Sequence, residues 1–304
     1  MKHLQLFVIL LSWMLLSQCG MPGNTGSNQP SPAIQDQFSL INYRDLYAGG
    51  GDYGRPLWSP DGRKILLVKA NNAGLYLMPA AGNASLLRIQ DGEGADYEAV
   101  WARGGQSVLF SRTAPRAEGR EAWEYWVTDA RLIPRKDVPV DALQSFVASA
   151  EKGPLVSLNP AGFQLEGRDK GGEKSWPVTI APGPYDHPLV APGGKLVIAH
   201  RDGNMLLFRT DGGGLLAELG PGKASSWSAD ARYLLAHLPE PAGGQAAAHS
   251  ELYLIDTRNG RRWQLTSTPD IAESWPSWNS RSTQVVFKDE KTGKIMAADL
   301  KLPH

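Results

Sequence analysis

The sequence has little cysteine and no excess of either charge. It contains one cysteine among 304 residues, and its 31 lysines and arginines are balanced by 31 aspartates and glutamates. A single cysteine excludes an internal disulfide framework and a thiolate metal cluster. A net charge of zero argues against nucleic-acid binding, which requires excess basic charge to meet the phosphates. We therefore expect neither a disulfide-stapled scaffold nor a nucleic-acid partner.

Catalytic signatures are also missing from the sequence. It has no Gly-x-Ser-x-Gly pentapeptide, which carries the nucleophile of an α/β-hydrolase, and no glycine-rich loop that leads into a helix to hold a phosphate. None of its six histidines follows the spacing of metal ligands. These are His3, His187, His200, His237, His249 and His304. We accordingly expect a protein that is not an enzyme, with no catalytic residue, no cofactor and no metal.

The residues that are abundant are typical of a turn-rich β protein. The chain contains 33 glycines, 22 prolines and 10 tryptophans, and hydrophobic residues make up 42% of it. Glycine and proline favour tight turns for different conformational reasons. The apolar fraction is large enough to bury a core, so the composition excludes a chain that is disordered throughout.

The N-terminus has the pattern of an export signal followed by a tether. Lys2 precedes an apolar run from Leu4 to Leu16, which is shorter than the about 20 residues that span a bilayer. The run ends at the only cysteine, in Leu16-Ser17-Gln18-Cys19, which resembles the lipobox of bacterial lipoproteins. That resemblance implies cleavage before Cys19 and its lipidation, although the family prefers a smaller residue at position 18. The alternatives are an ordinary cleaved signal and an uncleaved anchor.

Residues 20–36 contain too few apolar side chains to form a core and are expected to be a flexible tether. We therefore divide the chain into a signal peptide at 1–18, a lipidated Cys19 with its tether at 19–36, and a folded domain at 37–304. This organisation predicts an extracytoplasmic protein that is bound to the membrane through its lipid.

A repeat of about 44 residues runs through the folded domain. Its clearest copy is the segment 55–68, in which the turn Ser59-Pro60-Asp61-Gly62 joins two apolar segments. Proline, aspartate and glycine suit successive positions of a type I turn, so this copy predicts a strand, a tight turn and a second strand. The anchors of the six copies are Trp58, Trp101, Val147, Val190, Trp227 and Trp278.

Each copy has a third apolar segment and several have a fourth, which is the strand content of a β-propeller blade. Six such copies account for the chain from about residue 38 onward, including a degenerate third copy at 146–150. The last copy lacks a fourth strand, whereas the segment 38–43 has no blade of its own. We predict an all-β, six-bladed propeller, closed by pairing of 38–43 with the last blade, since an unpaired edge would otherwise be exposed.

The segment 58–65, Trp-Ser-Pro-Asp-Gly-Arg-Lys-Ile, resembles the WD40-like PD40 repeat of the periplasmic TolB propeller. The resemblance covers nearly all of the chain after residue 50, with one close copy. It implies a non-catalytic protein-interaction module at the bacterial cell envelope, with envelope proteins or a membrane complex as partners. Similar propellers that cleave polysaccharides leave an alternative open, a polysaccharide-binding or glycan-cleaving propeller.

Acidic and tyrosine residues recur four to six positions before the anchors. They are Asp52, Tyr53, Asp96, Tyr97, Asp141, Tyr185, Asp186 and Glu273. In a propeller these positions surround one mouth of the central channel, so we predict a candidate binding ring for a basic peptide segment or a cation. The alternative is that aspartate is simply favoured in turns, where it caps the local backbone.

Overall fold

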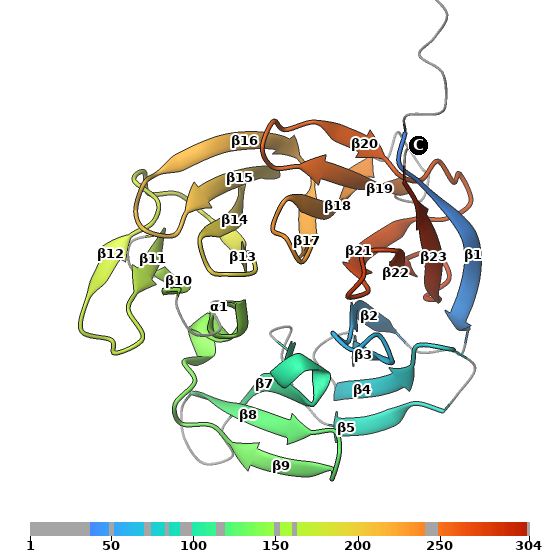
Figure 1. The fold of residues 1–304 in the computed structure, drawn as a ribbon, viewed down its shortest axis with the longest axis horizontal. Coiled ribbons are helices and arrows are strands. Elements are labelled where there is room, and N and C mark those ends of the chain that lie inside the picture. The colour runs from blue at the N-terminus through green and yellow to red at the C-terminus, as the bar shows by residue number, and fades with distance from the viewer. Residues whose placement is uncertain are drawn as a thin grey trace, which may run out of the picture. The chain divides into compact units, whose positions relative to one another are not determined.

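The computed structural model describes residues 37–302, except for 49–51, 70–73, 83–84, 92–98, 114–118, 149–152, 160–162 and 241–248. Its strands form six sheets, which are the blades of a propeller (Figure 1). The predicted six-bladed β-propeller is therefore confirmed. Residues 1–36, with Cys19 and the expected tether, lie outside the described residues.

Within the described residues, five blades have four antiparallel strands and one has three. Blade 1 contains β2 (Tyr53–Trp58), β3 (Lys64–Lys69), β4 (Gly74–Pro79) and β5 (Leu87–Asp91). Blade 2 contains β6 (Val100–Ala102), β7 (Ser107–Thr113), β8 (Arg120–Trp126) and β9 (Arg131–Pro134), with η3 (Arg103–Gly105) between its first two strands. Blade 3 contains β10 (Leu155–Asn159), β11 (Gln164–Arg168) and β12 (Ser175–Pro177), preceded by η4 (Val140–Ala142) and α1 (Leu143–Ala148). Blade 4 contains β13 (Asp186–Val190), β14 (Leu196–Arg201), β15 (Asn204–Arg209) and β16 (Leu215–Pro221). Blade 5 contains β17 (Lys223–Trp227), β18 (Tyr233–Glu240), β19 (His249–Asp256) and β20 (Arg262–Gln264). Blade 6 contains β21 (Glu273–Trp278), β22 (Gln284–Asp289), β23 (Ile295–Lys301) and β1 (Ser39–Tyr47).

The turn between the first two strands of a blade is fixed by side chains of the repeat. In blade 1 the hydroxyl of Ser59 donates to Asp61 Oδ1 at 2.6 Å and accepts a hydrogen bond from the backbone N–H of Lys64 at 2.9 Å. Blade 5 repeats the first of these bonds between Ser228 and Asp230, also at 2.6 Å. The Ser-x-Asp spacing is therefore explained by a local network that satisfies the polar groups of the turn.

The anchor tryptophans connect neighbouring blades. Three of them donate their indole N–H to a backbone carbonyl on the inner strand of the preceding blade. The bonds run from Trp101 to Leu57 at 2.9 Å, from Trp227 to Leu189 at 3.0 Å and from Trp278 to Ser226 at 3.3 Å. A tryptophan suits this position because it buries a large ring and still has one donor for the carbonyl.

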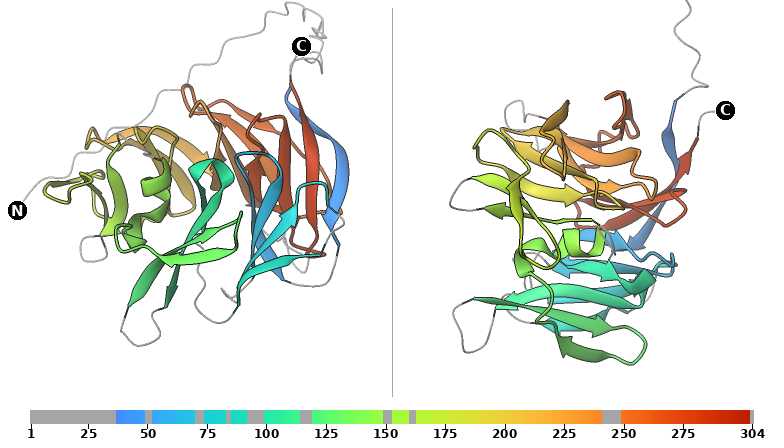
Figure 2. Two further views of the ribbon diagram at one scale, coloured as in Figure 1. Left: turned by 60° about the horizontal axis from the view of Figure 1, so that its bottom comes forward. Right: turned by 60° about the vertical axis from the view of Figure 1, so that its left-hand side comes forward.

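The closing strand is confirmed and is longer than the sequence pattern indicated. Strand β1 pairs antiparallel with β23, with Leu40 opposite Leu300 and Asp45 opposite Met296 (Figure 2). It thus supplies the fourth strand of a blade whose other three strands come from the C-terminal end of the described chain. The predicted segment 38–43 covers only the first part of this strand.

The degenerate third copy was predicted incorrectly. The residues around its anchor Val147 form the short helix α1 instead of an inner strand, and blade 3 starts directly with β10. The helix is held to the blade by Ser145, whose hydroxyl accepts the N–H of Val156 at 2.9 Å and donates to Ala142 O at 2.9 Å. Tertiary contacts with β6, β10 and β13 thus override the apolar pattern, which does not distinguish a short helix from a strand.

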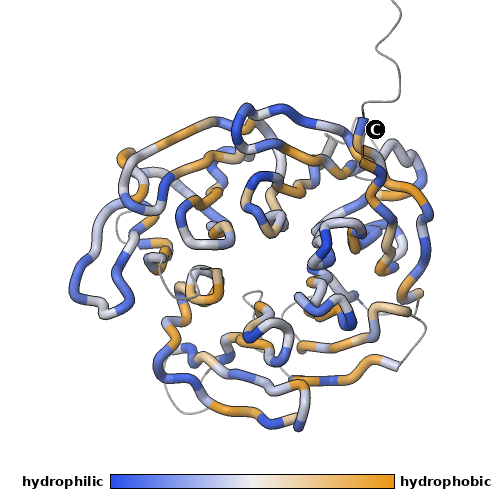
Figure 3. The backbone as a smooth tube through the Cα atoms, viewed as in Figure 1, coloured by the Kyte–Doolittle hydropathy of each residue, from blue (hydrophilic) through white to orange (hydrophobic). Residues whose placement is uncertain are grey.

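The core lies between blades as well as within them. Hydrophobic stretches run along the strands, whereas many turns are hydrophilic (Figure 3). One cluster joins Leu66 and Leu77 of blade 1 to Trp101 and Phe110 of blade 2. Because each blade buries apolar side chains against the next, the ring holds its inner strands in fixed positions around the channel.

Candidate binding site in the central channel

The predicted acidic ring is only partly assembled at one end of the channel. Asp52 accepts a hydrogen bond from Lys288 Nζ at 3.0 Å, and Asp186 Oδ1 lies 4.0 Å from Nδ1 of His200. Both carboxylates are therefore close to side chains near the ends of second strands, Lys288 on β22 and His200 on β14. Asp96 and Tyr97 lie outside the described residues.

The other members of the predicted ring have partners within the protein. Tyr53 is buried, and its ring makes an edge contact with Tyr76 at 5.2 Å. The hydroxyl of the buried Tyr185 donates to a backbone carbonyl at 3.1 Å. Asp141 forms an ion pair with Arg168 at 3.0 Å, whereas Glu273 is fully buried and accepts a hydrogen bond from Thr268. The ring is thus not a set of free carboxylates, and its role in binding stays a prediction.

Three inner strands carry the same irregularity near their start. The strand register shifts between Gly54 and Leu57 in β2, between Asp186 and Leu189 in β13, and between Ser274 and Ser277 in β21. The two residues that each shift passes over are an X-Pro dipeptide. These dipeptides are Arg55-Pro56, His187-Pro188 and Trp275-Pro276. Proline fits a bulge because it has no N–H to donate to the ladder.

The residue before each proline has a left-handed backbone, with φ of 45° at Arg55, 49° at His187 and 52° at Trp275. Such conformations are costly for residues with a Cβ, of the order of 1–3 kcal/mol each, and concentrate at functional sites. A β-bulge also changes the direction of a side chain. The same bulge on three blades brings an arginine, a histidine and a tryptophan together.

These side chains meet around Trp275. The guanidinium carbon of Arg55 lies 5.0 Å from the centre of its ring, and Nζ of Lys223 lies 4.6 Å from it. The rings of His187 and His237 lie 5.5 Å and 5.3 Å away. We call these five residues the channel cluster. Cations near an aromatic face are stabilised by the negative potential of the ring.

The histidines of this region are held in the neutral state. Burial, together with Arg55 and Lys223, lowers the pKa of His187 to about 3. Burial, together with Lys223, lowers the pKa of His237 to about 3 as well. His200, which packs beside His187, accepts the backbone N–H of Ala224 at its Nε2, 2.9 Å away, and burial lowers its pKa too. Burial favours the uncharged form of an imidazole, and at His200 it outweighs the nearby Asp186.

The channel cluster borders a cavity of about 290 Å³. It is lined by Gly54, Arg55, Val68, His187, Lys223, Trp275 and Lys288. Lys288 is neutralised by Asp52 and by Glu290, whose carboxylate lies 2.8 Å from its Nζ. Lys223 differs, because its ammonium forms no ion pair or hydrogen bond with any of the described residues. Burial lowers the pKa of Lys223, and Asp186 partly offsets this.

The buried Nε2 of His187 also lacks a hydrogen-bond partner among the described residues. A half-buried ammonium without a hydrogen-bond partner among the described residues therefore faces the cavity, and His187 forms part of its lining. Polar groups with little access to water are usually hydrogen-bonded, and an exception calls for an explanation. A ligand that brings anionic oxygen atoms would satisfy the ammonium. The described part of the chain has no set of three or more histidine, cysteine, aspartate or glutamate side chains placed to hold a metal ion.

The sequence analysis found no metal-ligand spacing among these histidines and missed the channel cluster. The recurring signal was present in the chain. Arg55, His187 and Trp275 each stand three residues before an anchor and directly before a proline. A comparison of the copies at that position alone would have identified them.

No protein-family model matches the sequence, and no curated protein is significantly similar to it. Solved structures with similar folds include a putative TolB from Agrobacterium tumefaciens, with 15% identity and a TM-score of 0.51 over 76% of this chain and 88% of that one. The β-propeller domain of Cps50 (Swd1) from Myceliophteria thermophila has 11% identity and a TM-score of 0.55, over 87% and 100% of the two chains. An oligogalacturonate lyase from Vibrio parahaemolyticus has 11% identity and a TM-score of 0.50, over 88% and 97%. These similarities show a TolB-like and WD40-like propeller fold.

Proposed function

We propose that the protein is an exported, lipid-anchored propeller that acts as a non-catalytic protein-interaction module at the bacterial cell envelope. We further propose that its channel cluster binds a carboxylate of the partner. The observation that supports carboxylate binding most directly is the ammonium of Lys223, which faces the channel cavity without an ion-pair partner among the described residues. Arg55 lines the same cavity, and its guanidinium supplies further donors.

The chemistry of the cavity favours an acidic ligand over a basic one. The carboxylate of Asp52 at this end is already paired with Lys288, whereas Lys223 keeps its charge close to Trp275. Hydrogen bonds between an ammonium and a carboxylate are stronger than those between neutral groups. An acidic side chain or a C-terminal carboxylate of a partner protein would fit these donors, with the cavity selecting for small groups.

The substitution Lys223→Met removes the ammonium and keeps an apolar stem of similar length. We expect it to weaken binding of short acidic peptides by about tenfold to a hundredfold, because a hydrogen bond to a charged group contributes about 1.5–3 kcal/mol. Fluorescence anisotropy with labelled peptides that end in a free or an amidated carboxyl group measures the change. Lys301→Met, at an exposed residue at the end of β23, is the matched control. Equal affinity of Lys223→Met and the unaltered protein would contradict the role of the cavity.

The envelope location has a separate test. Palmitate labelling of cells is expected to mark the protein and to be lost in the variant Cys19→Ser, because only a thiol at that position can carry the lipid. The same variant is expected to move from the membrane fraction to the soluble extracytoplasmic fraction. Labelling that persists without Cys19 would contradict lipidation at that residue, and an unlabelled protein that is still exported argues for an ordinary signal instead of a lipid anchor.

A second function, as an enzyme or a glycan-binding protein, is favoured by Arg55 and Lys223, which line the same cavity. Their cations would bind the carboxylate of an acidic sugar. Incubation with a panel of acidic and neutral polysaccharides separates the two functions. New chain ends that form with the unaltered protein but not with Lys223→Met would support glycan cleavage. If the unaltered protein produces no new chain ends, the binding module is supported.

A further inference from the structure

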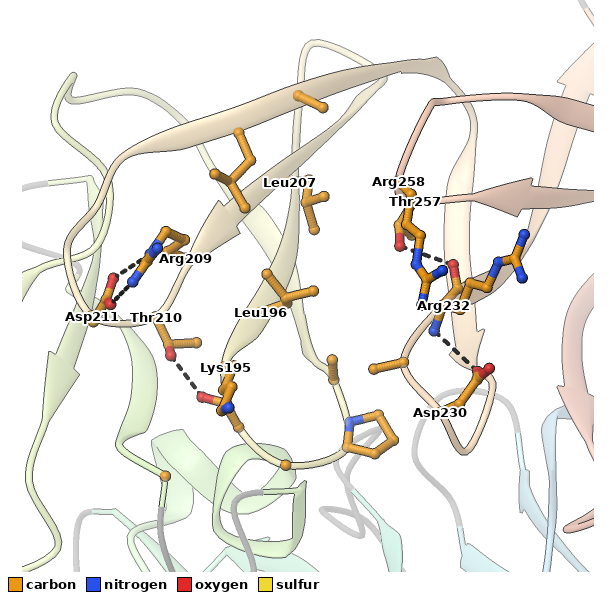
Figure 4. A pocket seen from close by; sticks show the side chains of 18 of the residues that line it. Lys195, Leu196, Leu207, Arg209, Thr210, Asp211, Asp230, Arg232, Thr257 and Arg258 are labelled. Carbon is orange, nitrogen blue, oxygen red and sulfur yellow. Dashed lines mark hydrogen bonds and ion pairs between the residues drawn. The ribbon is translucent and has the colours of Figure 1, made fainter.

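A second and larger cavity lies between blades 4 and 5 (Figure 4). It has a volume of about 1100 Å³. One wall comes from blade 4 and carries Lys195 and Arg209, and the other comes from blade 5 and carries Arg232 and Arg258 (Figure 4). We call this cavity the interblade groove.

The interblade groove and the channel cluster lie at opposite ends of the strands. Strands β13 and β15 run in the same direction, since β14 is antiparallel to both. The turns that follow them, at 191–195 and 210–214, therefore lie at one face, and the start of β13 with His187 lies at the other. The groove uses the residues of these turns, so it is a separate site from the channel.

The floor of the groove is apolar. It is formed by Leu196, Leu207, Leu216 and Ala217. Leu216 is 49% exposed and its neighbour Leu215 is 47% exposed, on the outer strand β16. Leu216 also lines the cavity, so the floor presents an apolar side chain that a partner could cover.

The rim of the groove is basic, and part of its charge is unbalanced. Arg209 is paired with Asp211, and Arg232 binds Asp256 at 2.9 Å. The side chains of Lys195 and Arg258 make no ion pair with any residue that the structure describes. Asp230, the other acidic residue of the rim, accepts hydrogen bonds from the Ser228 hydroxyl and the Arg232 N–H.

We propose that the interblade groove docks a segment of a partner protein in which apolar residues are flanked by acidic ones. The apolar side chains would cover Leu207 and Leu216, and the carboxylates would pair with Lys195 and Arg258 on opposite walls. Complementary charges select the partner and its register, while burial of the apolar side chains supplies affinity. Two walls around a recessed floor suit a peptide segment better than a flat lipid surface. This site is independent of the carboxylate in the channel, so either proposal can fail alone.

The test uses the full-length protein and labelled peptides of about nine residues, long enough to cross the groove when extended. One set has leucines flanked by glutamates, a second has leucines flanked by lysines, and a third has serines flanked by glutamates. In the Lys223→Met background, which removes the ammonium that the channel offers to acidic peptides, we expect only the first set to bind, with an affinity that falls as salt rises. The double variant Lys195→Glu/Arg258→Glu is expected to weaken binding by at least about tenfold.

A control variant in the same Lys223→Met background makes the result specific to the groove. Arg281→Glu changes an exposed charge on the corresponding turn of blade 6. It is not expected to change the affinity for the first peptide set, and thermal unfolding of each variant verifies its fold. The proposal is overturned if the three sets bind equally, if none binds, if the double variant binds normally, or if only anionic phosphatidylglycerol vesicles bind.

Discussion

Replacing Glu273 with glutamine is expected to stabilise the folded protein by about 3 kcal/mol above pH 7 and to leave its stability unchanged below about pH 4.5. Glu273 is fully buried at the start of β21 and accepts a hydrogen bond from the Thr268 hydroxyl. The backbone N–H of Thr268 donates to Glu251 at 3.0 Å. Thr268 is therefore hydrogen-bonded to two buried carboxylates, those of Glu251 and Glu273. The second oxygen of each carboxylate has no hydrogen-bond partner among the described residues.

Burial, together with the nearby Glu251, raises the pKa of Glu273 from 4.5 to about 7. The folded state therefore keeps a proton on Glu273 in a pH range where the unfolded chain has lost it. The stability that this proton contributes is complete below pH 4.5 and is lost as the pH rises to 7. Burial, Glu273 and Glu251 also raise the pKa of Tyr43 on the closing strand to about 12, which indicates that the strand adjoins this acidic pair.

Urea unfolding of the unaltered protein and of Glu273→Gln at several pH values measures this effect. The difference between their free energies of unfolding isolates Glu273 from the buried histidines, whose titration acts in the opposite direction at acidic pH. Glu218→Gln, at an exposed residue of β16, is the control and is expected to follow the unaltered protein. If the free energies of unfolding of the unaltered protein and of Glu273→Gln differ by a constant amount from pH 4.5 to pH 8, Glu273 is ionised throughout that range.

Truncation of Leu46 to alanine is expected to destabilise the propeller by about 3 kcal/mol, within the 2–5 kcal/mol measured for buried leucines. Leu46 lies on the closing strand, is 2% exposed and packs with Trp58 of blade 1 and Val286 of blade 6. The substitution leaves a cavity where the first and last blades meet. Since β1 is the outer strand of blade 6, the loss is expected to act directly on ring closure.

Ile41→Ala is the matched control on the same strand, because Ile41 is 40% exposed. Its effect on the free energy of unfolding is expected to stay within about 0.5 kcal/mol, as for most surface substitutions. Chemical denaturation of both variants measures their free energies of unfolding. The slope of the free energy against denaturant concentration shows whether cooperativity has changed. Similar losses in the two variants would mean that the side chains of β1 contribute little beyond its backbone pairing.

Most of the fold could be predicted because its determinants are local. The Ser59–Asp61 turn is fixed by hydrogen bonds between residues close in the chain, and the apolar segments around it alternate with turn residues. The unpaired segment near Leu40 and a last copy with three strands together predicted the closing strand, which the structure confirms. The helix α1 was missed because a six-residue apolar segment fits a strand or a helix equally well, and contacts from neighbouring blades decide between them.

The amino-acid sequence by itself determined the number of blades and the position of ring closure, since both follow from repeated short-range patterns. It also contained the three X-Pro dipeptides that begin with Arg55, His187 and Trp275. Their meeting around one cavity was decided only by the tertiary structure, because residues up to 220 positions apart become neighbours when the blades close into a ring. The same closure removed the water that would otherwise keep His187 and His237 ordinary bases, and it left Lys223 facing the cavity without a carboxylate partner among the described residues.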